Sequence, residues 1–216
     1  MASMQNVCNE ASMSTRVKIC GLTRPEDVEM AIRRGADYLG FIVEAKSARR
    51  LSIADAAKLS RPIKSIIPAV AVTVNADDDL VQRIMDVMQP DYIQLHGDET
   101  PERAAYIREN YSVKTIKALS IKTDADLAHA ARFDVDLLLL DAKPPKGAAR
   151  GGHGVAFDWE ILTKAKLPAN WALAGGITPE NAARAAAMTN APILDVSSGV
   201  EAAPGIKDGS KIKALM

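Results

Sequence analysis

Eight short apolar runs alternate with eight helical patterns along the chain, and this alternation limits the possible fold more than any other feature. The runs predict strands over residues 17–20, 38–43, 69–74, 92–95, 115–118, 137–141, 171–174 and 193–196. The patterns after them predict helices over residues 25–34, 53–59, 78–88, 101–110, 124–130, 158–164, 179–188 and 210–216. Eight such units without a linker or composition break favour a single-domain α/β protein, a parallel eight-stranded TIM (β/α)8 barrel, over an open sheet.

Helix start and stop signals agree with these boundaries. Four predicted helices begin directly after a residue with a capping hydroxyl, and in two of them proline takes the first helical position. The four hydroxyl residues are Ser52, Thr100, Thr123 and Thr178. Gly35 follows the first helix at the position that a left-handed cap prefers.

The composition restricts the partners. The 27 basic residues balance the 27 acidic residues, so no excess charge favours nucleic acid or an anionic membrane, and a small molecule is the expected ligand. No apolar run approaches the roughly 20 residues that a membrane span needs. The balanced charge and the lack of an obvious apolar patch lead us to expect a monomer.

The first residues differ in character from the rest. Residues 1–15 are polar and lack an apolar core segment, so they predict a disordered tail rather than a signal or transit peptide, and the barrel occupies residues 16–216. Cys8 lies in this tail and Cys20 at a strand end, an arrangement that predicts no disulfide, no metal site and a reducing, cytoplasmic location.

In such a barrel the active site lies where the strands end. The predicted strands end in polar or small residues: Cys20, Glu44 with Lys46, Asn75, His96, Lys117, Asp141, Gly175 with Gly176, and Asp195 with Ser197 and Ser198. The last two loops combine glycines, hydroxyls and a helix start, which together suit a phosphate group. These phosphate-binding candidates are Gly175, Gly176, Ser197, Ser198 and Gly199, and two ordinary tight turns are the alternative.

Two strand ends carry groups that can move protons. Asp141 ends a run of four leucines, where partial loss of solvent would raise its pKa and suit it to donate a proton; capping a loop or pairing with Lys143 is the alternative. Cys20 is either a small buried apolar residue or, near Lys or Arg, a thiolate that accepts a proton.

Other candidates stay open on the residues alone. Arg49 could hold a carboxylate with its planar guanidinium, but Arg50 and Lys46 are close by and equally charged. His96 either lines the active face or is satisfied within its loop. His153 lies in a glycine-rich segment that could cover the sixth strand.

The chain resembles the phosphoribosylanthranilate isomerases, the cofactor-free enzymes of tryptophan biosynthesis. The resemblance runs in order through KICGLT, GADYLGFIV, KSARR, YIQLHGDE, LLLLDAK, GGHGVAFDW, LAGGITPEN and DVSSGVE, and covers residues 17–216. Two positions depart from the family: Ala48 stands where many relatives have a proline, and His153 where they often have a small hydroxyl residue.

The resemblance implies roles for particular residues. Cys20 would be the general base and Asp141 the general acid, while Arg49 would hold the anthranilate carboxylate. The phosphate would lie on Gly175, Gly176, Ser197, Ser198 and Gly199, with Asp195 as an auxiliary residue near the sugar. No metal or other cofactor is implied.

The implied reaction is an Amadori rearrangement of N-(5-phosphoribosyl)anthranilate to 1-(2-carboxyphenylamino)-1-deoxyribulose 5-phosphate. Two alternatives remain at this stage. One is a related phosphosugar isomerase or epimerase barrel, and the other is a barrel that binds a phosphosugar without catalysis.

Overall fold

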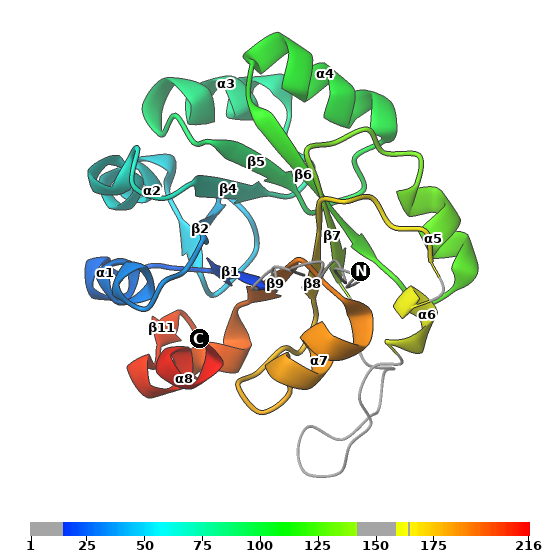
Figure 1. Ribbon diagram of the computed structural model, residues 1–216. Helices are drawn as coiled ribbons and strands as arrows, with labels where there is room; N and C mark the ends of the chain where they lie inside the picture. Colours follow the sequence, from blue (N-terminus) through cyan, green and yellow to red (C-terminus); the bar gives the residue numbers. More distant parts are fainter. Residues whose placement is uncertain (1–14, 142–158, 164) are drawn as a thin grey trace, which may run out of the picture.

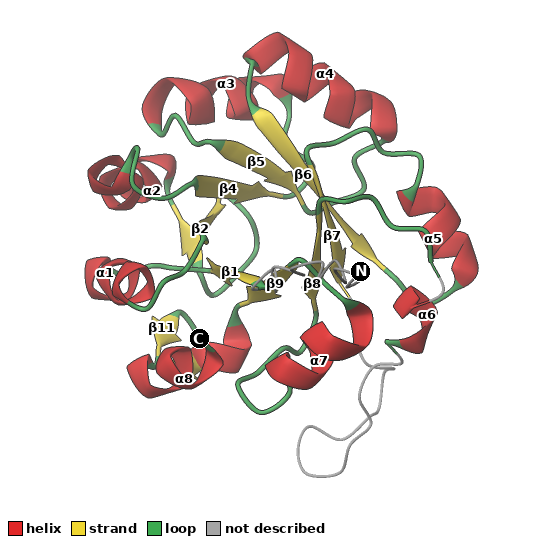
Figure 2. Cartoon of the chain, in the orientation of Figure 1, coloured by secondary structure: helices red, strands yellow, loops and turns green. Residues whose placement is uncertain are grey.

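The computed structural model describes residues 15–141, 159–163 and 165–216. Within these residues, eight parallel strands form a closed barrel and the helices lie around its outside (Figure 1). The strands follow the order β1-β9-β8-β7-β6-β5-β4-β2, and pairing of β1 with β2 closes the ring. The predicted TIM barrel is therefore confirmed, with strands inside and helices outside (Figure 2).

The element boundaries lie close to those predicted. The barrel strands are β1 (Arg16–Cys20), β2 (Tyr38–Val43), β4 (Ala69–Thr73), β5 (Tyr92–Leu95), β6 (Lys114–Ser120), β7 (Leu137–Asp141), β8 (Trp171–Ala174) and β9 (Ile193–Val196). The helices are α1 (Pro25–Arg33), α2 (Ile53–Ser60), α3 (Asp78–Val87), α4 (Pro101–Tyr111), α5 (Asp124–Ala130), α6 (Glu160–Thr163), α7 (Ala182–Thr189) and α8 (Gly209–Leu215).

Three of the four predicted capping hydroxyls are confirmed. Ser52, Thr100 and Thr123 each accept a hydrogen bond from the backbone N–H three residues later. Thr178 is not the cap of α7, which begins at Ala182, three residues later than predicted. The amide of Asn181 explains the delay, because it accepts from the N–H of Thr178 and donates to the carbonyl of Gly176, which holds the segment in a turn.

Three short strands were not predicted. Strand β3 (Arg50–Leu51) extends the sheet beside β2, and β10 (Glu201–Ala203) pairs antiparallel with β11 (Ile206–Lys207). Two or three residues are too few to show a periodicity of two. The hairpin turns at Gly205, whose φ of 81° favours glycine.

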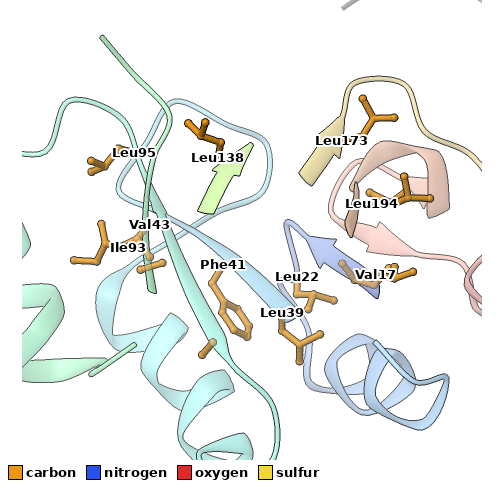
Figure 3. Close-up of a cluster of buried hydrophobic side chains, with 14 of the residues drawn as sticks. Val17, Leu22, Leu39, Phe41, Val43, Ile93, Leu95, Leu138, Leu173 and Leu194 are labelled. Carbon is orange, nitrogen blue, oxygen red and sulfur yellow. The ribbon is translucent and has the colours of Figure 1, made fainter. Parts of the chain in front are cut away.

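Alternate residues of each strand face opposite sides of the barrel wall. On β7, Leu137 and Leu139 belong to the cluster inside the barrel, whereas Leu138 and Leu140 pack in the larger cluster between strands and helices. Figure 3 shows part of the larger cluster, in which Phe41 lies among leucine, isoleucine and valine side chains of several strands. An unbroken apolar run is therefore a strand buried on both faces.

Lys117 is a buried charge in the outer layer. Its neighbours on β6, Ile116 and Ala118, belong to the inner cluster, so Lys117 points away from the barrel interior although it was among the strand-end candidates. Its Nζ lies 2.7 Å from Oε2 of Glu99, and both side chains are almost fully buried. Burial alone would raise the pKa of Glu99, but the Lys117 ammonium and the N–H of Asn75 lower it below its usual range.

Some predictions fall outside the described residues. These are nearly all of the expected tail over 1–15, the segment that contains Lys143 and His153, and the ends of the helix predicted over 158–164. No helix in the described part of the chain is long and apolar enough to cross a membrane.

The buried pair leads to a prediction about stability. Lys117→Met should lower the free energy of unfolding by about 3–5 kcal/mol, because Glu99 is left as an uncompensated buried charge. Arg33→Met is the control, since the Arg33–Glu29 pair is exposed and should change stability little. Urea denaturation of both variants measures the difference, and equal effects would contradict the prediction.

The same experiment has a pH dependence with a defined sign. Because the pKa of Glu99 is lower in the folded protein than its ordinary value of 4.5, its contribution is present above that value and is lost as pH falls through the folded pKa. The stability gap between wild type and Lys117→Met should therefore shrink in acid.

Candidate active site

Cys20 lies at the carboxyl end of β1 and belongs to the inner cluster of the barrel. Its backbone is opposite Gly40 of β2, and a Cβ on Gly40 would come within 2.8 Å of the Cys20 Sγ and 3.2 Å of the Lys18 Nζ. Glycine at this position therefore provides the space that both side chains occupy. Burial raises the pKa of the Cys20 thiol, against the lowering effect of the Lys18 charge.

Lys18 is a fully buried charge beside the thiol. It precedes Cys20 by two residues on the same strand face, and its Nζ lies 2.7 Å from Oδ1 of Asp195, its partner in register on β9. Burial would lower the pKa of Lys18, but the charges of Asp195 and Cys20 raise it above its ordinary value. Sequence reasoning missed Lys18. The signal was a lysine within an apolar strand, at the spacing that shares a face with the cysteine.

Arg49 and Arg50 point to different partners. Arg49 donates from Nε and Nη2 to the two carboxylate oxygens of Glu201, at 2.7 Å and 2.6 Å. Arg50 instead binds Glu44 at the surface, and more than half of its side chain is exposed. Arg49 also packs over Gly21, where an added Cβ would come within 2.5 Å of its Cδ. Of the two arginines, Arg49 is therefore the one held beside the Cys20 loop.

Lys207 connects this arginine to the thiol strand. Its buried Nζ donates to the carbonyls of Cys20 and Ser197, at 2.7 Å and 3.1 Å, and to Oε1 of Glu201 at 2.9 Å. Burial lowers the pKa of Lys207. Burial would raise the pKa of Glu201, but Arg49 and Lys207 bring it below its usual range. Neither Glu201 nor Lys207 was predicted as a site residue; Glu201 lies within DVSSGVE, but Lys207 follows it without a recognisable pattern.

The loops after β8 and β9 touch each other. Gly175 and Gly176 have φ angles of 93° and 68°, and no atom lies within 4 Å of the position that a Cβ of Gly176 would take. Gly199, in the short 3-10 helix η2 (Ser198–Val200), packs so closely that its Cβ would lie 1.9 Å from the carbonyl oxygen of Ile177. Such an approach needs glycine. The two predicted phosphate loops thus form one surface. Ser197 connects this surface to the loop after β1, because a Cβ on Gly21 would come within 3.0 Å of the Ser197 Oγ.

Asp141 ends β7 with its side chain largely buried. Its Oδ2 lies 3.9 Å from Nε2 of His96, the residue that follows β5. His96 Nδ1 is 2.9 Å from Nε2 of Gln94, inside the barrel. His96 therefore lies at the active face beside the candidate acid, rather than being satisfied only within its own loop.

The described residues give no sign of a metal centre. Among them, no three His, Cys, Asp or Glu side chains are grouped to hold an ion. The free thiol of Cys20 is buried next to Lys18. What this arrangement offers is an acid, a potential thiolate base, an oriented guanidinium and glycine-rich loops, a set suited to proton transfer on an anionic small molecule.

Known proteins are similar to this chain over nearly its whole length. The family model of N-(5'-phosphoribosyl)anthranilate (PRA) isomerase matches residues 17–216. An N-(5'-phosphoribosyl)anthranilate isomerase of Parvibaculum lavamentivorans is 44% identical over 209 residues, which cover 94% of this chain and 97% of that protein. The crystal structure of phosphoribosyl anthranilate isomerase from Thermotoga maritima has a TM-score of 0.80 and 34% identity, and covers 94% of this chain and 97% of that one.

A further crystal structure of phosphoribosyl anthranilate isomerase contains reduced 1-(o-carboxyphenylamino)-1-deoxyribulose 5-phosphate. It matches with a TM-score of 0.77 and 32% identity, over 94% of this chain and 96% of that one. The sequence motifs, the closed barrel and these relatives lead to one conclusion. The chain belongs to the N-(5'-phosphoribosyl)anthranilate isomerase family of tryptophan biosynthesis.

Proposed function

We propose that this isomerase converts N-(5-phosphoribosyl)anthranilate to 1-(2-carboxyphenylamino)-1-deoxyribulose 5-phosphate, with Asp141 as general acid and Cys20 as general base. The observation that carries the assignment is the placement of these two groups. Both side chains occupy inward-facing positions at the carboxyl ends of barrel strands. Their strands, β7 and β1, are separated in the barrel by β8 and β9. A sugar bound at the barrel mouth would lie between them.

Asp141 and Cys20 each carry out one proton transfer, and tautomerisation of the product of these steps completes the reaction. Protonated Asp141 gives its proton to the furanose ring oxygen as the bond from that oxygen to C1 breaks, which leaves a Schiff base. The Cys20 thiolate then removes the proton from C2, and the electron pair of that C–H bond moves to give an enolamine. The enolamine becomes the ketone by taking up a proton at C1 and losing one from the C2 hydroxyl. None of these steps requires a metal or redox cofactor.

Arg49 is proposed to bind the anthranilate carboxylate. Glu201 accepts from one edge of the guanidinium, Nε and Nη2, and thereby fixes the plane of the group. The edge that includes Nη1 would then bind the substrate carboxylate. An arginine with a fixed plane can donate two parallel hydrogen bonds to a carboxylate, which a lysine cannot.

The substrate phosphate is proposed to lie on the surface made by Gly175, Gly176, Ser197, Ser198 and Gly199. The open position above Gly176 would let a phosphate approach the backbone N–H groups closely. Asp195 would lie near the sugar through its position beside Lys18. We retain as predictions a monomeric, cytoplasmic protein that uses no cofactor and binds no nucleic acid.

Replacing the acid or the base should abolish turnover without unfolding the barrel. Cys20→Ser exchanges the thiol for a far weaker acid that forms no useful base near neutral pH, and Asp141→Asn removes the transferable proton. Each should lower kcat by at least about 100-fold. Freshly formed phosphoribosylanthranilate is the substrate, and the protein-dependent change of its anthranilate fluorescence is the readout.

Cys8→Ser is the matched control and should keep wild-type activity. Circular dichroism checks that each variant is folded. Near-normal activity of both Cys20→Ser and Asp141→Asn would refute the assignment. Binding of the substrate by the wild type without any fluorescence change would instead indicate a barrel that binds a phosphosugar and does not catalyse.

The two arginines should respond differently to the same substitution. Arg49→Lys removes the planar pair of donors and should raise KM by about 10-fold or more, since a charge-assisted hydrogen bond contributes about 1.5–3 kcal/mol. Arg50→Lys should change KM less than about twofold, because its exposed pair with Glu44 contributes little. Steady-state kinetics of both variants test this, and the reverse order would assign the carboxylate to Arg50.

A further inference from the structure

Lys18 is an unusual residue for the interior of an apolar barrel. The inner cluster around it consists of valine, isoleucine, leucine, alanine and aromatic side chains together with Cys20, and Lys18 itself has no exposed surface. Removing an ammonium group from water carries a large free-energy cost, which an ion pair only partly offsets. An apolar residue would fill this position at no such cost, so the charge itself calls for an explanation.

The direction of the Lys18 side chain gives that explanation. Lys18 and Cys20 share one face of β1, and both the Nζ and the Sγ lie within 3.2 Å of the point that a Cβ of Gly40 would occupy. The space left by this glycine is thus where ammonium and sulfur meet. Asp195 holds the ammonium in place from the other side, through the 2.7 Å contact with its Oδ1.

Four charged groups act on the thiol. Arg49 from the loop after β2 and Lys207 from β11 contribute positive charge, and both bind the carboxylate of Glu201, which offsets one of their two charges. Lys207 also contacts the Cys20 carbonyl rather than its sulfur. Asp195 on β9 contributes negative charge. Lys18 is therefore the cation directed at the sulfur itself.

We propose that Lys18 is a positioning residue for Cys20. Its ammonium, held by Asp195 in the space that Gly40 leaves, stabilises the thiolate that removes the substrate proton. Burial raises the pKa of the Cys20 thiol, and the charge of Lys18 is the largest of the influences that lower it. Asp195 has two opposite effects, since it orients the ammonium and repels the thiolate. The catalytic consequence rests on the proposed role of Cys20, whereas the effect on the thiol does not.

The test is a titration of the Cys20 thiol without substrate. In a Cys8→Ser background Cys20 is the sole cysteine, so isotope-labelled cysteine gives one Cβ resonance whose shift follows ionisation. Lys18→Met should raise the midpoint by about one pH unit or more, which is tenfold less thiolate at a given pH. Lys18→Gln is the second variant, because its amide can still donate to Asp195 and preserve the fold.

Two further variants separate charge from packing. Asp195→Asn keeps a partner for Lys18 but removes the negative charge, so it should lower the midpoint. Lys117→Met breaks a buried pair of the same kind, also 2.7 Å long, in the outer layer, and should leave the midpoint unchanged. A midpoint that stays within about 0.3 unit in both Lys18 variants, or that Lys117→Met raises equally, would overturn the proposal.

The pH profile of kcat/KM distinguishes this proposal from the role of Cys20 as base. If the titration midpoint of the thiol and the pH of the acidic limb both rise in Lys18→Gln, the effect of Lys18 on the thiol and the role of Cys20 as base are both supported. A raised thiol midpoint with an unchanged acidic limb would refute Cys20 as the base, and with it the catalytic role of Lys18. An unmoved thiol midpoint would refute the effect of Lys18 while leaving the role of Cys20 intact.

Discussion

The ammonium of Lys207 holds together parts of the site that are far apart in the sequence. It donates to the carbonyl that ends β1, to the carbonyl of Ser197 after β9 and to the carboxylate of Glu201. Glu201 in turn fixes the plane of Arg49. One buried cation thus connects the thiol strand, the proposed phosphate loop and, through Glu201, the proposed carboxylate-binding arginine. The short hairpin β10–β11 carries both Glu201 and Lys207.

Among the described residues, three ion pairs have both side chains buried, and they lie in two different places. Lys117 and Glu99 lie in the outer layer, away from Cys20, and their contribution is to stability. Lys18 with Asp195, and Lys207 with Glu201, lie next to the thiol. Because a buried ion pair seldom stabilises a protein more than an apolar pair of the same volume, the concentration of such pairs around one cysteine points to chemistry rather than to folding.

The strand and helix order could be predicted from the sequence because it depends on local patterns. The LLLL run before Asp141 predicts a strand, and the hydroxyl before α4 predicts a helix start, from neighbouring residues alone. The start of α7 could not be placed in this way, since the amide of Asn181 competes with the cap expected at Thr178. Lys207 lay beyond any local rule, because its three acceptors come from three separate segments. Lys18 was within reach, since a lysine two residues before a cysteine in an apolar strand has to share its face.

The proposed substrate explains why the site needs so much positive charge. The carboxylate and the phosphate of the substrate together carry about three negative charges at neutral pH, and a thiolate adds a fourth beside them. Coulomb repulsion would then raise the pKa of Cys20 further just when the substrate binds. Arg49 and the loop N–H groups can bind the two anionic groups of the substrate, but these groups lie at the ends of the substrate. Only a cation next to the sulfur can offset the repulsion where the proton is removed, and Lys18 occupies that place.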